Sequence, residues 1–145
     1  MDGDAQTFEV PEGVFQVRQE VRWGDLDALH HVNNTVYFRY FEEARVQLFT
    51  ALDGTAFARR PVVLAQASCD FLIPLLYPAS IVVGLKLVRV GRSSLELECW
   101  IADPADVTKV YARGRSVLVC IDEHTHRSVA WPPEQLQVLQ RCFSA

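Results

Sequence analysis

Between residues 62 and 121 apolar and polar residues alternate, and this period of two constrains the fold more than any other feature of the chain. The alternation covers residues 62–73, 81–90, 94–101 and about 107–121. Successive side chains of a strand point to opposite faces of a sheet, so each segment is predicted to be a strand. Short connections join the four segments, which predicts neighbouring antiparallel strands in a meander.

Two elements are predicted before this sheet. Residues 14–23 alternate in the same way, as is typical of a half-buried strand. The apolar face of this strand is formed by Phe15, Val17, Val21 and Trp23. In residues 35–51 apolar side chains recur every three or four positions and extend onto several faces, which predicts one long helix covered on most sides. A sheet that wraps around the helix would provide this cover.

The chain is predicted to be a single domain, because its 145 residues, of which 50% are hydrophobic, are enough to bury one core. Residues 1–12 are expected to be a flexible N-terminal segment. Residues 133–143 follow Pro132 and are amphipathic, which predicts a short terminal helix.

Composition excludes several classes of function. A net charge of −4 argues against a nucleic-acid partner, because phosphate binding requires a dense basic face. No apolar run approaches the roughly 20 residues that cross a bilayer, and the acidic start does not resemble a secretory signal, so a cytoplasmic location is expected. The cysteines are widely spaced, which predicts buried thiols rather than disulfides or a metal site. They are Cys69, Cys99, Cys120 and Cys142.

The polar segment 24–34 is the best candidate for a functional site. It precedes the predicted helix, whose first turn presents unsatisfied N–H groups and the positive end of the helix dipole. Asn33, Asn34 and Thr35 are all suitable N-caps. These N–H groups could polarise a carbonyl, and the carboxylate of Asp27 could act either as nucleophile or as general base for water. The alternative is that Asp25 and Asp27 only order the loop and cap the helix.

The order of residues along the chain resembles that of the 4-hydroxybenzoyl-CoA thioesterase family of hotdog-fold proteins. The resemblance extends from about residue 14 to residue 140. Its landmarks are Val21-Arg22-Trp23-Gly24-Asp25-Leu26-Asp27, His31-Val32-Asn33-Asn34, Tyr37, Tyr40-Phe41-Glu42-Glu43-Ala44-Arg45, Pro61-Val62-Val63, Asp70-Phe71-Leu72-Ile73-Pro74, Gly91-Arg92-Ser93-Ser94, Val119-Cys120-Ile121-Asp122 and Thr125-His126-Arg127.

This resemblance implies an α+β hotdog fold, with a curved antiparallel sheet wrapped around the long helix. It also implies a homodimer or homotetramer with sites at the subunit boundary, and hydrolysis of an acyl-CoA thioester without a cofactor. Asp27 matches the catalytic carboxylate of the family. The backbone N–H of Asn34 matches the group that holds the thioester carbonyl, with Asn33 and Val32 as neighbouring candidates.

One departure from the family pattern lies within the loop. The family usually has glycine where this chain has His30, and glycine reaches positive φ with less strain than histidine. The loop could be reshaped, or His30 could enter the pocket or form a hydrogen bond with Asp25 or Asp27. His30, His31 and Asp25 are therefore expected to support the loop rather than act in catalysis.

Two further sets of residues match the family. Glu42 and Arg45 lie three residues apart on the predicted helix, close enough to pair with each other. Arg92, Ser93 and Ser94 occupy a glycine-containing turn between strands and are the candidates for binding coenzyme A phosphates. The alternative for this turn is a purely solvated connection.

Two other functions remain open from the sequence. A hotdog dehydratase acting on 3-hydroxyacyl thioesters would need a histidine and an acid at one substrate, and His31 with Asp27 could supply them. A non-catalytic acyl-CoA binding or sensing module would use the same pocket, but it would have no need of a carboxylate at the carbonyl.

Overall fold

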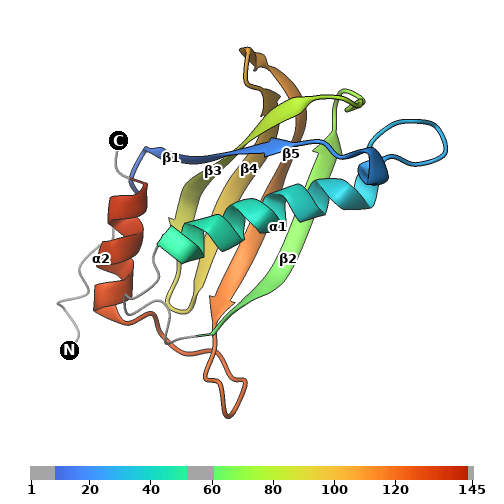
Figure 1. Ribbon diagram of the computed structural model, residues 1–145. Helices are drawn as coiled ribbons and strands as arrows, with labels where there is room; N and C mark the ends of the chain where they lie inside the picture. Colours follow the sequence, from blue (N-terminus) through green and yellow to red (C-terminus); the bar gives the residue numbers. More distant parts are fainter. Residues whose placement is uncertain (1–8, 52–60, 144–145) are drawn as a thin grey trace.

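The computed structural model describes residues 9–51 and 61–143, and its strands form one five-stranded antiparallel sheet (Figure 1). The order of strands across the sheet is β1-β3-β4-β5-β2. The strands are β1 (Val14–Glu20), β2 (Val62–Phe71), β3 (Ser80–Val90), β4 (Ser94–Asp103) and β5 (Asp106–Cys120). The helices are α1 (Asn34–Ala51), α2 (Pro133–Cys142) and the short 3-10 turn η1 (Trp23–Asp25). Residues 1–8 of the predicted N-terminal segment lie outside the described residues.

The predicted meander is correct for β3, β4 and β5 but wrong for β2. β2 pairs with β5, whereas β1 takes the place beside β3. The two strands that flank α1 in sequence therefore lie at opposite edges of the sheet. Alternation identifies a strand and its faces, but it does not determine which neighbour the strand pairs with.

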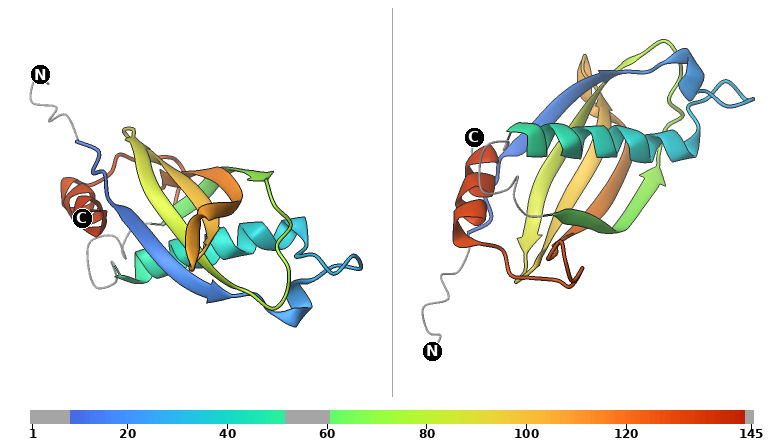
Figure 2. Two further views of the ribbon diagram at one scale, coloured as in Figure 1. Left: turned by 90° about the horizontal axis from the view of Figure 1, so that it is seen from above. Right: turned by 60° about the horizontal axis from the view of Figure 1, so that its bottom comes forward.

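The long helix α1 lies across one face of the curved sheet, which confirms the predicted hotdog fold (Figure 2). Alternate residues of β4 face this helix, and all of them are buried, as the period of two predicted. They are Leu95, Leu97, Cys99 and Ile101. On the helix the buried positions recur at spacings of three and four, so α1 and the sheet share one core.

Two predictions about burial are wrong for the single chain. α1 is covered on one side only, because Val46 is 52% exposed and Phe38 is 37% exposed. Trp23 is 74% exposed, because β1 ends at Glu20 and η1 turns the chain away from the strand direction before residue 23.

The remaining elements lie close to their predicted positions. α2 packs with Leu139 and Phe143 fully buried, and the four cysteines form no disulfide. Cys99 and Cys120 are buried, whereas Cys69 and Cys142 are only half-buried. Among the described residues, no helix is both long enough and apolar enough to cross a membrane.

Candidate active site at the start of α1

The polar segment before α1 folds as a small hairpin-like loop that projects beyond the helix (Figure 1). Leu26 and Val32 form an isolated antiparallel bridge at its base. On one side of the bridge, the Asp27 N–H donates to the His31 carbonyl at 2.9 Å. On the other side, the Asn33 N–H donates to the Asp25 carbonyl at 2.9 Å. The backbone thus places the two acids beside the start of α1.

Asn33 is the N-cap among the three candidates. Its Oδ1 accepts hydrogen bonds from the Thr35 N–H at 2.9 Å and from the Thr35 hydroxyl at 2.7 Å. A side-chain oxygen that receives an N–H of the first turn is the usual N-cap arrangement, and it explains why α1 begins at Asn34.

The backbone bonds distinguish the three candidate donors for a substrate carbonyl. The Val32 N–H donates to the Leu75 carbonyl at 2.8 Å, and the Asn33 N–H is bonded to Asp25. Asn33 is therefore not an available donor, because its N–H closes the loop. The Asn34 N–H has no acceptor among the described residues. Asn34 is exposed at the positive end of the helix dipole, which makes its N–H the suitable donor to an external oxygen.

Asp27 is half-buried, and one of its carboxylate oxygens is already engaged. Its Oδ1 accepts the Leu29 N–H at 2.8 Å, so Asp27 orders the loop, as the alternative interpretation of this residue predicted. Its Oδ2 has no hydrogen-bond partner among the described residues and is available for another group.

Asp25 supports the loop through three hydrogen bonds. Its Oδ2 accepts the Arg22 N–H at 2.9 Å and the Tyr40 hydroxyl at 2.7 Å, and its carbonyl accepts the Asn33 N–H. Burial and the neighbouring Asp25 carboxylate both raise the pKa of Tyr40, so the phenol remains a donor. Tyr40 therefore ties the loop to the second turn of α1. No role for Tyr40 was predicted from the sequence, although a hydroxyl on the buried side of an amphipathic helix was the available signal.

His30 adopts the left-handed conformation, with φ 60°. Its N–H donates to the Asp27 carbonyl at 3.0 Å, which closes the tip of the loop. The carboxylates of Asp25 and Asp27 accept hydrogen bonds from backbone N–H groups and not from the His30 imidazole. Both His30 and His31 are exposed. The chain thus keeps the backbone shape that glycine favours and accepts some strain at this position.

An apolar surface adjoins the start of α1 on the β2 side. The Tyr37 ring packs edge-on against Phe71 of β2, with 4.9 Å between ring centroids. The Tyr37 hydroxyl accepts the Leu75 N–H at 3.2 Å, and burial raises the pKa of this phenol. Several apolar side chains here are exposed in the single chain, namely Phe38, Phe71, Leu72, Ile73 and Leu76.

The turn with Arg92, Ser93 and Ser94 lies at the opposite end of the sheet from the loop. β3 begins beside the loop, since Val21 N–H donates to the Ala79 carbonyl, and it ends at this turn. Its 11 residues span about 35 Å. The structure therefore does not bring Arg92 and Asp27 of one chain together. The turn is held in place by the Ser94 carbonyl, which accepts the Gly91 N–H at 2.8 Å.

Glu42 and Arg45 do not form the predicted ion pair. Arg45 is 8% exposed, and its Nη1 donates to the Ser116 Oγ of β5 at 3.2 Å. Glu42 is exposed on the same helix. The two side chains diverge because Arg45 points under the helix toward the sheet.

Residues 21–139 match the sequence pattern described as the thioesterase-like superfamily. The chain belongs to this superfamily. Among solved structures, this thioesterase-like chain is similar to "PA2801 protein, a putative Thioesterase" of Pseudomonas aeruginosa, with 37% identity, 86% and 94% of the two chains covered, and a TM-score of 0.73. It is also 37% identical to "a putative acyl-CoA thioesterase" of Xanthomonas campestris, with 79% and 99% covered and a TM-score of 0.70. A curated relative, the "Putative esterase" of Aquifex aeolicus, is 30% identical over 131 residues, covering 87% of this chain and 98% of the relative.

Proposed function

We propose that this protein is an acyl-CoA thioesterase that hydrolyses an acyl-CoA thioester to a carboxylic acid and coenzyme A. The observation that carries the proposal is that the Asn34 N–H has no acceptor among the described residues. Asp27 lies in the loop that leads into this end of α1, and its Oδ2 has no hydrogen-bond partner among the described residues. The relatives of Pseudomonas aeruginosa and Xanthomonas campestris support the same class of reaction.

In the proposed reaction the thioester carbonyl oxygen accepts a hydrogen bond from Asn34 N–H. This bond strengthens as negative charge develops on the oxygen, and the helix dipole adds to the effect. Asp27 either attacks the carbonyl carbon and forms an acyl anhydride that water hydrolyses, or takes a proton from the water that attacks. In both routes the carbon–sulfur bond breaks and coenzyme A leaves as a thiolate. A thiol of pKa near 8.5 needs little acid assistance to leave.

The proposal includes a homodimer whose two chains build each site. β2 is an edge strand, and residues on both of its faces are exposed, including Val63 and Leu64. A ten-residue edge without proline or lysine is a template for pairing with another strand. A two-fold axis at the middle of β2 would pair the strand with its symmetry mate and extend the sheet across both chains.

This dimer would also bring an Arg92 turn close to an active-site loop, which a single chain does not do. The two-fold reverses the direction of the second chain, so the turn of one chain approaches the loop of the other. Arg92, Ser93 and Ser94 would then meet the phosphates of a coenzyme A whose thioester lies at the partner's Asp27. The proposal places the enzyme in the cytoplasm, where four cysteines without a disulfide are expected to remain reduced.

The decisive experiment compares Asp27→Asn with the wild-type protein on short, medium, long and aromatic acyl-CoA substrates. Free acid should be followed as well as thiol, because the protein itself contains cysteines. Asparagine keeps the side-chain oxygen that accepts the Leu29 N–H, so the loop is preserved while the charge is removed. The expected loss of kcat is about 10²-fold or more.

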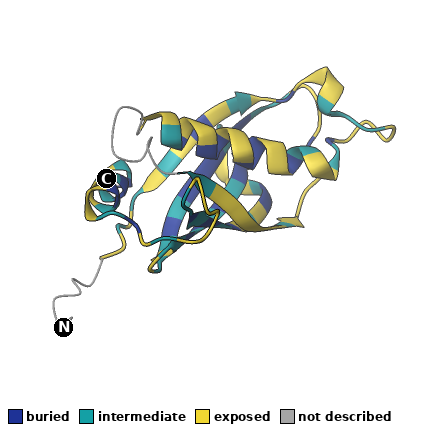
Figure 3. Ribbon diagram, turned by 90° about the horizontal axis from the view of Figure 1, so that it is seen from below, coloured by how far each residue is buried: buried dark blue, intermediate teal, exposed yellow. Residues whose placement is uncertain are grey.

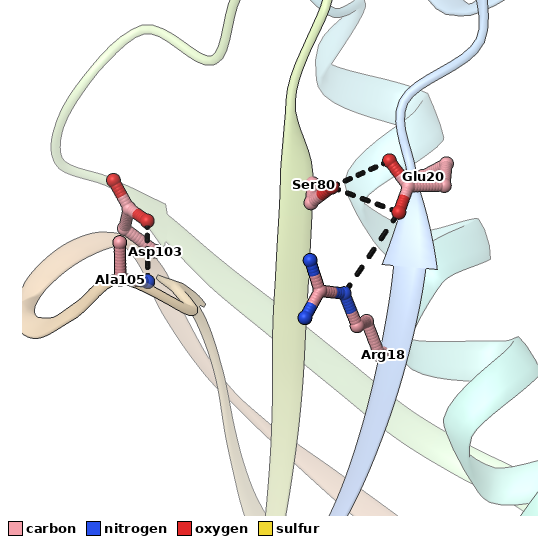
Figure 4. A network of polar contacts seen from close by, with 5 residues as sticks. All are labelled: Arg18, Glu20, Ser80, Asp103 and Ala105. Atoms are coloured by element: carbon pink, nitrogen blue, oxygen red, sulfur yellow. Dashed lines mark hydrogen bonds and ion pairs between the residues drawn. The ribbon is translucent and has the colours of Figure 1, made fainter.

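Asp103→Asn is the matched control. Asp103 Oδ1 accepts the Ala105 N–H at 2.8 Å, which is the same local arrangement as Asp27 with Leu29, and this bond is separate from the contacts among Arg18, Glu20 and Ser80 (Figure 4). This variant should keep wild-type turnover. Equal turnover in both variants would remove Asp27 from the reaction.

The second candidate is an acyl-CoA binding module without catalysis. The observation in its favour is the hydrogen bond from Leu29 N–H to Asp27, which gives the carboxylate a structural use. Tight binding of acyl-CoA by the wild-type protein, with no acid released from any substrate, would select this candidate.

A further inference from the structure

Arg45 carries a buried charge that no other described residue balances. The side chain lies between α1 and the sheet and is 8% exposed. A guanidinium has five N–H donors, but Ser116 Oγ is the only hydrogen-bond acceptor that the described residues provide. Burial lowers the pKa of Arg45, because the charged form is desolvated. A buried cation of this kind is normally accompanied by a carboxylate.

Glu42 is the carboxylate nearest to this position on the helix, and it is unengaged. It lies one turn before Arg45, and its negative charge opposes the lowering of the pKa of Arg45. The two groups are not within ion-pair distance, and Glu42 has no hydrogen bond or ion pair among the described residues. Within the described part of each chain, α1 therefore presents one under-coordinated cation and one unpaired anion on adjacent turns.

By helical spacing both residues belong to the side of α1 nearer to β2, with Glu42 at its outer edge, where it also lines a hollow with Arg18 and Glu20 of β1. Phe38 and Glu42 are four residues apart, and Arg45 follows after three more, so the three form one stripe. The Phe38 ring contacts Phe71 of β2, with 6.5 Å between ring centroids. Exposed positions occur on both α1 and β2 when the molecule is viewed from below (Figure 3).

The sheet register places Arg45 at the level of the middle of β2. Its acceptor Ser116 is directly opposite Ala67, and β2 runs from residue 62 to residue 71. A two-fold axis through the middle of β2 would therefore pass close to Arg45. The same axis would set the two α1 helices antiparallel, so residues on either side of position 43 or 44 would face each other.

We propose that, in the homodimer, Arg45 of each chain forms an ion pair with Glu42 of the other. The inference rests on the β2-paired dimer of the proposed function and adds the contact between the two helices. The pair occurs twice by symmetry, and it gives the buried guanidinium the carboxylate that the described residues of its own chain do not provide. Charge complementarity and continuity with the exposed β2 edge favour a second copy of this chain as the occupant of this flank.

The test compares Glu42→Gln with Glu43→Gln. Both glutamates are exposed, adjacent in sequence and in contact with the same hollow, but Glu43 accepts a hydrogen bond from Gln47 at 2.9 Å and lies farther round the helix from β2. Neither change is expected to unfold the chain. Subunit exchange between donor-labelled and acceptor-labelled proteins, followed by energy transfer, measures the dissociation rate whatever the affinity.

Glu42→Gln should increase the exchange rate by about 30-fold or more, because two buried charges lose their partners. Glu43→Gln should exchange at the wild-type rate. In addition, Arg45→Met should accelerate exchange less in the Glu42→Gln background than in the wild-type background, because the pair is already broken. Sedimentation of the wild-type protein provides the reference state.

The outcomes separate the two proposals. A wild-type protein that sediments as a monomer overturns the dimer, and with it both proposals as they stand. A wild-type dimer in which Glu42→Gln and Glu43→Gln exchange at the same rate overturns the ion pair and leaves the β2-paired dimer intact.

Discussion

Replacing Tyr40 with phenylalanine tests whether the candidate loop is held in place by the helix. The change removes one hydroxyl and leaves the ring, which is 5% exposed, in its buried position. The hydroxyl donates to Asp25 Oδ2 at 2.7 Å, and these residues are 15 positions apart in sequence. Its loss therefore removes the side-chain link between the loop and the second turn of α1 without creating a cavity.

The magnitude follows from the contacts of Asp25. A hydrogen bond to a charged acceptor contributes about 1.5–3 kcal/mol when both groups are shielded from water. Asp25 is half-buried and keeps the Arg22 N–H, so about 1–1.5 kcal/mol is expected. For a domain of this size the midpoint of thermal unfolding should fall by roughly 3–5 °C. Turnover should fall about threefold to tenfold, because Asp27 and Asn34 are placed less accurately.

The assay is thermal unfolding by circular dichroism together with turnover of the best acyl-CoA substrate. Tyr77→Phe is the control, because Tyr77 is 45% exposed and its hydroxyl has no hydrogen-bond partner among the described residues. All proteins should be compared at one concentration, since association adds to apparent stability. Equal unfolding temperatures and equal turnover in the two variants would refute the role of Tyr40.

Two further predictions concern His30 and Cys99. His30→Gly should raise the free energy of unfolding, measured in urea, by about 0.5–1 kcal/mol, because glycine adopts the positive φ without strain and this gain exceeds the entropic cost of glycine. His30→Ala keeps the strain and should give no such gain. Equal effects of the two changes would exclude strain at this position. Burial raises the pKa of Cys99 to about 12, so the folded state keeps this proton while the unfolded thiol loses it above pH 9. Stability should therefore fall as pH rises from 9 toward 12, by on the order of 1 kcal/mol per pH unit from this group. Urea unfolding at several pH values should show a shallower slope for Cys99→Ala, and an unchanged slope would exclude this thiol as a cause.

Local patterns in the sequence predicted the elements well. The alternation in β4 correctly predicted its buried face. This strand lies inside the sheet, paired with β3 on one side and β5 on the other, so one of its faces is covered along its whole length. The cluster of Asn33, Asn34 and Thr35 indicated the start of α1, although only the bond from Thr35 N–H to Asn33 selects the N-cap. Such features depend on residues a few positions apart.

Features that depend on residues far apart in sequence could not be predicted from local patterns. The sequence alone leaves the Asn33 N–H as a candidate donor, whereas in the fold the Asp25 carbonyl lies opposite it across the loop and accepts its hydrogen bond. The Arg45 side chain could have turned toward Glu42, but Ser116 lies 71 positions away in sequence and accepts its hydrogen bond. In both cases the tertiary fold supplied a competing partner.

The length of β3 has a consequence for inheritance. A chain that has lost Asp27 still carries an intact Arg92 turn, and a chain that has lost the turn still carries an intact loop. In the proposed dimer, a mixed pair of such chains would combine one faulty site with one complete site. With random pairing, two inactive alleles would together restore about a quarter of the normal number of sites. Damage at one end of the strand would thus be complemented by a copy damaged at the other end.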